Sequence, residues 1–125
     1  MRKIFGMIVV GLVISSASQA EIFTFRDNGG YFRAINETGK EIVNVHGVDL
    51  FEVSPNLVGY LAPGGVFVVV TSKGDEIMRS RDVREFQVGS GLVGYRDGTG
   101  RVRAINMAGE EILNVSGVSR YKVGR

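Results

Sequence analysis

The sequence contains no cysteine and a single histidine, and each scarcity excludes particular kinds of chemistry. Without cysteine the chain cannot form disulfides, use a thiolate as a nucleophile or metal ligand, or carry a lipid on an N-terminal cysteine. A histidine that acts in catalysis needs an oriented partner, and no such partner accompanies His46. We therefore expect no catalytic residue, no cofactor and no metal site, and we predict that the protein is not an enzyme.

The longest apolar run lies at the N-terminus, at residues 4–14, and only glycine interrupts it. It is too short for the roughly 20 residues that a membrane-spanning helix needs. Arg2 and Lys3 precede it, and Ser18-Gln19-Ala20 offers small residues at the positions that a signal peptidase reads. Residues 1–20 are therefore predicted to be a signal peptide cleaved after Ala20. The protein would be exported to the periplasm or the extracellular space, with no stable membrane anchor after cleavage.

An excess of charge of either sign is also missing from the predicted mature chain. The full sequence has 15 basic and 13 acidic residues, and removal of Arg2 and Lys3 with the leader makes the two equal. Non-specific binding to nucleic acid needs a basic excess, so we expect no nucleic-acid partner. The same balance argues against a purely electrostatic attachment to membranes.

The rest of the chain contains one pattern three times, at residues 22–53, 57–88 and 92–123, each copy offset by 35 residues. The first and third copies are identical at 15 of 32 positions, and the second and third at 10. A fixed period in this range is the signature of a repeat architecture. We predict a single repeat domain over residues 21–125.

Each copy splits at its glycines into four short segments, which in the third copy are residues 92–96, 101–106, 111–115 and 119–123. These segments are rich in β-branched and aromatic residues and are bounded by turn residues, which is typical of strands. No window long enough for a helix lacks a glycine. The sequence therefore predicts an all-β protein of three tandem, four-stranded antiparallel repeats.

The columns shared by the three copies predict the turns and the core. Two glycines recur in each copy where a turn needs a positive φ: Gly30, Gly65 and Gly100, then Gly39, Gly74 and Gly109. Five apolar columns are predicted to form the core: Ile42, Ile77, Ile112; Val48, Val83, Val118; Val53, Val88, Val123; Phe25, Tyr60, Tyr95; and Phe51, Phe86, Tyr121. Residues 66–70 are apolar on both faces, which predicts a strand covered on both sides.

The recurring Val-x-x-aromatic-x-Val, followed in the third copy by Gly-Leu-Val-Gly-Tyr, resembles the passage between blades of a β-propeller. The resemblance covers residues 22–123 and implies propeller-like blades. Closed propellers have 4–8 blades, so three blades would stay open or pair with a second chain in a six-bladed ring. The alternative is a β-trefoil, because residues 29–36 also resemble the first hairpin of a trefoil unit.

Several polar residues could form a ligand or partner surface. Arg33 and Asn36 recur as Arg103 and Asn106, either on solvated strands with the asparagine entering a turn or as equivalent sites for a sugar or peptide. The middle copy adds a basic patch of Arg79, Arg81 and Arg84. The recurring Glu41, Glu76 and Glu111 are interpreted as exposed residues that start a strand.

Three functions fit these observations. The first is an exported non-catalytic binding or scaffold module that acts through protein–protein interaction or self-association, with a protein partner or a homo-oligomer. The second is a lectin-like module that binds a small carbohydrate. The third is a secreted hydrolase inhibitor, which would need only one protruding loop.

Overall fold

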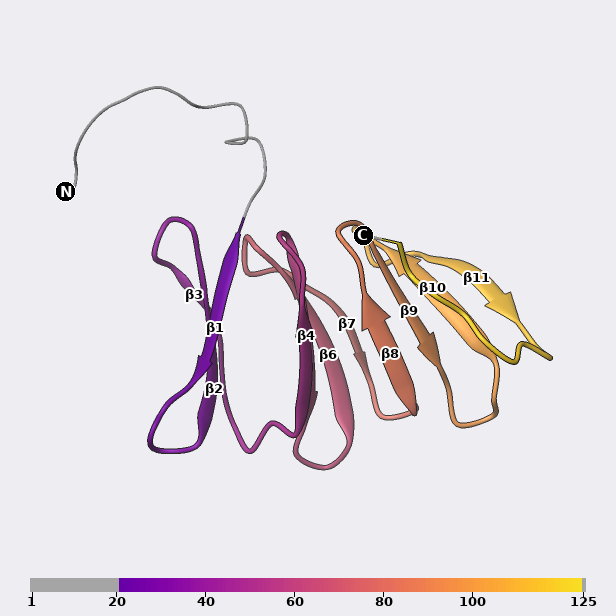
Figure 1. Cartoon of the computed structure of the whole chain (residues 1–125), viewed down its shortest axis with the longest axis horizontal. Helices are drawn as coiled ribbons and strands as arrows, with labels where there is room; N and C mark the ends of the chain where they lie inside the picture. The colour runs from indigo at the N-terminus through magenta and orange to yellow at the C-terminus, as the bar shows by residue number, and fades with distance from the viewer. Residues whose placement is uncertain (1–20, 125) are drawn as a thin grey trace, which may run out of the picture.

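The computed structural model describes residues 21–124, so the predicted signal peptide lies outside the described residues. The described part of the chain is all-β, without a helix, and forms three antiparallel sheets (Figure 1), which confirms the predicted fold class. The strands are β1 (Ile22–Arg26), β2 (Tyr31–Asn36), β3 (Glu41–His46), β4 (Leu50–Val53), β5 (Leu57–Ala62), β6 (Val66–Thr71), β7 (Glu76–Ser80), β8 (Glu85–Val88), β9 (Leu92–Arg96), β10 (Val102–Asn106) and β11 (Glu111–Val115).

The sheets do not coincide with the sequence repeats. The first sheet contains β1 to β3, the second β4 to β7 and the third β8 to β11, each in sequence order. The last segment of each of the first two copies therefore becomes the first strand of the next sheet. The cause is the short connection at residues 54–56: the Ser54 N–H donates to the Leu57 carbonyl at 2.8 Å, so β4 folds back onto β5 as a hairpin.

This shift in phase leaves both ends of the array incomplete. The first sheet has only three strands, because no repeat precedes it within the described residues. The last segment of the third copy, residues 119–123, was predicted to be a strand, and that prediction is wrong: it pairs with no strand of residues 21–124. A strand needs a ladder partner, and residues 21–124 contain no further sheet that supplies one.

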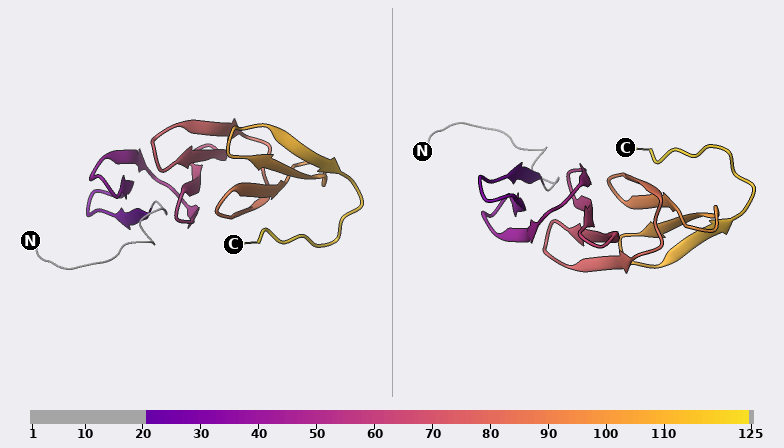
Figure 2. Two further views of the ribbon diagram at one scale, coloured as in Figure 1. Left: turned by 90° about the horizontal axis from the view of Figure 1, so that it is seen from above. Right: turned by 90° about the horizontal axis from the view of Figure 1, so that it is seen from below.

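The three sheets stack face to face in a fan, with β6 near its middle (Figures 1 and 2). No ladder joins one sheet to another, an arrangement that is blade-like. One apolar cluster lies between the first and second sheets and another between the second and third. All of β6 is buried, as its apolar sequence predicts, because it is covered by a neighbouring sheet on each face.

The predicted core columns are buried where a neighbouring sheet covers them. Tyr60, Tyr95 and Val88 are buried in the two clusters. The prediction is wrong for Ile112, which is 55% exposed because no sheet within residues 21–124 follows the third one. It is also wrong in part for Phe51, which is 39% exposed on the edge strand β4 although its ring packs 4.6 Å from that of Phe32.

The predicted glycine turns are confirmed. In the second turn of each copy the glycine φ is 85°, 95° and 80° at Gly39, Gly74 and Gly109. Gly30, Gly65 and Gly100 have φ of 84°, 78° and 90° in the first turn. Residues with a Cβ rarely adopt this conformation, which is why glycine recurs there.

Two further glycines are required by close packing on a face of their sheet. A Cβ on Gly59 would lie 2.8 Å from Val88 Cγ2, and one on Gly94 would lie 2.8 Å from Val123 Cγ2. These two glycines are themselves 35 residues apart, as are the valines that they contact. A strand residue without a side chain thus lets β8 approach the second sheet and residues 119–123 approach the third.

We predict that Gly59→Ala destabilises the protein by about 1–3 kcal/mol, because the new methyl group overpacks a close contact. Gly91→Ala is the matched control, since a Cβ there would meet nothing within 4 Å. The free energies of unfolding in urea would give the comparison. Equal stabilities for the two variants would contradict the packing that we describe.

Candidate interaction surfaces

Residues 119–123 contact β8 through the same kind of hydrogen bond by which β8 contacts β4. Glu52 Oε1 accepts a hydrogen bond from the Val88 N–H at 2.9 Å. One repeat later, Gln87 Oε1 accepts from the Val123 N–H at 2.8 Å, and its Nε2 donates to the Tyr121 carbonyl at 3.2 Å. The same side-chain to backbone bond therefore joins β4 to β8 and β8 to the C-terminal segment.

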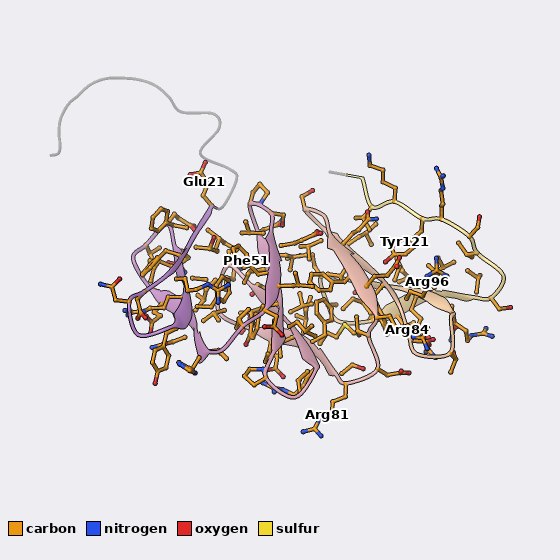
Figure 3. All side chains as sticks on the ribbon, turned by 60° about the horizontal axis from the view of Figure 1, so that its bottom comes forward. Glu21, Phe51, Arg81, Arg84, Arg96 and Tyr121 are labelled. Atoms are coloured by element: carbon orange, nitrogen blue, oxygen red, sulfur yellow. The ribbon has the colours of Figure 1, made fainter. Side chains whose placement is uncertain are left out.

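Other contacts of this segment also repeat internal ones. The Arg26 guanidinium donates to the Val48 carbonyl at 2.6 Å, and its equivalent Arg96 donates to the Val118 carbonyl at 2.9 Å. Arg96 also lies 5.7 Å from the ring of Tyr121 (Figure 3). Burial, with the nearby charge of Glu85, raises the pKa of Tyr121 to about 12. The segment is thus held in a defined place on the third sheet.

The outer face of the third sheet, which we call the C-terminal end face, is apolar. It comprises Leu92, Ala104, Leu113 and Val115, which share a face in the ladders of β9, β10 and β11. Leu113 is 44% exposed, whereas its equivalent in the first sheet, Val43, is buried against the second sheet. The C-terminal end face therefore repeats an internal packing surface, but no sheet of the described residues covers it.

The outer face of the first sheet, the N-terminal end face, is apolar as well. It comprises Phe23, Phe25, Tyr31 and Ile35, with Phe23 paired to Ile35 across the ladder and its ring 5.7 Å from that of Phe25. Phe23 is 67% exposed. The equivalent residues of the second sheet are Val58, Tyr60, Val66 and Val70, and all of them are buried against the first sheet.

The predicted surface arginines Arg33 and Arg103 are held in equivalent ion pairs. Arg103 donates to Asp97 at 2.7 Å and to Glu111 at 2.9 Å. Arg33 pairs with Glu41 and lies 3.8 Å from Asp27. The recurring glutamates at the start of β3 and β11 are therefore exposed, as predicted, and each has an arginine partner that the sequence analysis did not identify.

The predicted asparagines close turns, as one of the two interpretations expected. Asn36 Oδ1 accepts from the backbone N–H groups of Thr38 and Lys40, and Asn106 makes the same pattern with residues 108 and 110. Asn36 Nδ2 donates to the Ser72 carbonyl of the second sheet at 2.7 Å, and Asn106 Nδ2 donates to Glu110 instead. The ladder places Arg33 and Asn36 on opposite faces of β2, so they do not form one surface.

The predicted basic patch of the middle copy is spread over β7 and the loop that follows. Arg79 pairs with Glu76 at 2.8 Å and lowers the pKa of that carboxyl. Arg81 points away from the ribbon (Figure 3). Arg84 lines a groove of about 200 Å³ between β4 and β8, together with Leu50, Phe51 and Phe86 among others. The three arginines therefore do not converge on one point.

The sequence analysis did not identify the two end faces. Their residues occupy the same columns of the repeat as buried residues. The repeat pattern therefore assigns some of them to the core and gives no signal for the others. The signal that could have identified them is position in the array: a residue that faces a neighbour inside the array faces solvent at its first or last sheet.

No protein-family model matches the chain, and no curated protein matches its sequence. Among the described residues, no helix is long and apolar enough to cross a membrane. Residues 21–124 also contain no group of three or more histidine, aspartate and glutamate side chains placed to hold a metal ion. The described features that distinguish the two ends of the array are its exposed apolar faces, the three-stranded first sheet and the unpaired segment at residues 119–123.

We predict that Asp97 stabilises the protein above about pH 4 and that this stabilisation is lost as the pH falls further. Hydrogen bonds from the Thr99 hydroxyl and the Arg103 guanidinium hold the pKa of Asp97 well below its usual range. The folded protein therefore binds this proton more weakly than the unfolded chain. Asp97→Asn should lower the free energy of unfolding at pH 7 and have a smaller effect at pH 3, as measured by urea denaturation.

Asp27→Asn is the matched control, because Asp27 occupies the same position in the first copy. Its side chain is 30% exposed, against 3% for Asp97. We expect a smaller loss of stability at pH 7 for this variant. A loss in Asp97→Asn that is the same at pH 3 and pH 7 would contradict the assignment.

Proposed function

We propose that this protein is an exported, non-catalytic module that acts through protein–protein association at the two ends of its sheet array. The observation that carries the proposal is that each end face is an apolar surface whose internal equivalents are buried or partly buried against a neighbouring sheet. Exposed apolar patches of this kind mark sites of protein association. The export itself rests on the predicted signal peptide.

The edge of the first sheet supports the same proposal. β1 is paired on one side only, with β2, in the described part of the chain. Soluble proteins usually protect such an edge with charge, proline, a bulge or a covering segment. The only charged residue within β1 is Arg26, at its end. Phe23 and Phe25 lie on the same face of the strand. An edge of this composition is suited to pairing with another strand.

The polar groups of the repeats give less support to a carbohydrate site. Arg33 and Arg103 are held by carboxylates, and the side-chain oxygens of Asn36 and Asn106 accept hydrogen bonds within their own turns. A sugar would have to compete with these contacts. Association through apolar faces needs no such displacement.

Photo-crosslinking in the producing cells tests the proposal. We expect the crosslinking amino acid p-benzoylphenylalanine to form adducts with a polypeptide when it replaces Phe23 or Leu113, because both lie on the exposed end faces. Lys73 is the control position, since it is exposed in the turn after β6, away from the end faces. Denaturing gels followed by mass spectrometry would detect the adducts. A yield at both end faces no higher than at Lys73 would overturn the proposed function.

A further inference from the structure

Within residues 21–124, the first sheet has one strand fewer than the other two, and the last repeat segment has no ladder partner. The second and third sheets each begin with a strand that comes from the end of the preceding repeat, β4 or β8. The first sheet begins directly with β1. Residues 119–123 are the repeat equivalent of β4 and β8, and they have no ladder partner in the described chain. The strand that the first sheet lacks and the unpaired residues 119–123 thus correspond to the same segment of the repeat.

We propose that residues 119–123 of one copy of this chain pair with β1 of a second copy and complete its first sheet. This inference rests on the proposed function and names the partner. It joins one chain to the next in the manner of strand addition to an open sheet edge. If two copies exchanged these segments reciprocally, six four-stranded sheets would result, a number within the range of closed propellers.

The internal ladders give the register of the proposed pairing. Phe51 pairs with Tyr60 and Glu52 with Gly59, and one repeat later Phe86 pairs with Tyr95 and Gln87 with Gly94. Extension of the same register to the next junction places Tyr121 opposite Phe25 and Lys122 opposite Thr24. In each case the residue from the end of one copy meets the first strand of the next.

The backbone of β1 is oriented to accept this strand. Hydrogen-bonded and non-hydrogen-bonded pairs alternate along an antiparallel ladder. The Asp27 N–H donates to the Tyr31 carbonyl, so every second residue before Asp27 also bonds to β2. The residues between them, Ile22, Thr24 and Arg26, therefore direct their backbone N–H and carbonyl groups away from β2. In the complete sheets the Asp49 and Arg84 N–H groups donate to Leu61 and Arg96. By the same spacing, the Ser119 N–H would donate to the Arg26 carbonyl of the second copy.

The faces brought together by this pairing are the two end faces. Tyr121 lies on the third sheet, as shown by its contact with Arg96. If β1 of a second copy paired with residues 119–123, Phe23 and Phe25 of that copy would face Leu113 and Val115. This is the same combination of faces that packs Tyr60 of the second sheet against Phe32 of the first, with rings 5.8 Å apart.

A second copy fits better than another protein because its end face is already matched to the one it would cover. Both end faces are built from the repeat that packs on itself at the two internal junctions. Pairing within one chain is blocked, because the second sheet and β8 lie between β1 and residues 119–123. One difference is that Lys122 replaces Glu52 and Gln87 and cannot accept the hydrogen bond that those residues accept.

The absence of cysteine allows a direct test by engineered disulfides. We would mix a chain carrying Thr24→Cys with a chain carrying Lys122→Cys, oxidise the mixture and identify the linked peptides by mass spectrometry. Directly opposed residues of an antiparallel pair lie within the Cα separation that a disulfide spans. We expect the mixed disulfide in at least tenfold excess over that in the control, which combines Phe23→Cys with Lys122→Cys. Phe23 neighbours Thr24 in sequence but points to the opposite face of β1.

Circular dichroism and urea unfolding would establish that each cysteine variant is folded, and light scattering of the unmodified chain would report its mass. A mixed disulfide specific to Thr24→Cys, together with a unit of two or more chains, supports strand donation. A folded chain that stays monomeric, or one that associates without this disulfide, overturns it. If Phe23 still crosslinks to a different polypeptide in cells, the strand donation fails while the proposed function stands.

Discussion

Face-to-face packing between successive sheets is the constraint on which the rest of this structure depends. A single sheet of three or four short strands cannot bury enough apolar surface to be stable alone, so each repeat relies on its neighbour. The two clusters on either side of β6 show the result: the strand is buried along its whole length because it serves both interfaces. Stability is therefore shared across junctions, and an uncovered sheet at either end is a direct consequence.

Much of the local structure could be predicted from the sequence, because local rules determine it. The turn glycines have the positive φ that their recurrence indicated, and the apolar run at residues 66–70 is the most covered strand. The phase of the sheets could not be predicted in this way. A repeat pattern is periodic, so it does not show whether residues 50–53 close one unit or open the next. The hairpin at Ser54 decides the question: the Ser54 N–H donates to the Leu57 carbonyl, and the Leu57 N–H donates to the Ser54 hydroxyl at 3.1 Å. Other turn residues of the chain form such hairpins as well, so the serine alone does not indicate the phase.

The environment of equivalent residues was harder to predict for the same reason. Asp27 and Asp97 are the same residue in the same turn, yet the side chain of Asp97 is 3% exposed and that of Asp27 is 30% exposed. Tyr60 and Phe25 differ in the same way, since only Tyr60 has a sheet packed over it. Amino-acid identity assigns each residue to a column of the repeat. The position of its sheet in the stack determines whether the side chain is buried.

The glycines at positions 59 and 94 have a further consequence for the shape of the array. Each lets a valine of the following repeat segment, Val88 or Val123, approach within contact distance, whereas the equivalent residue in the first sheet is Thr24, which carries a side chain. A hollow of about 290 Å³ lies at this first junction, lined by Ile22 and Val53 among others. The residue in this column therefore limits how closely the following segment approaches the sheet. We expect larger residues in that column to hold adjacent sheets further apart and so to change the curvature of the fan.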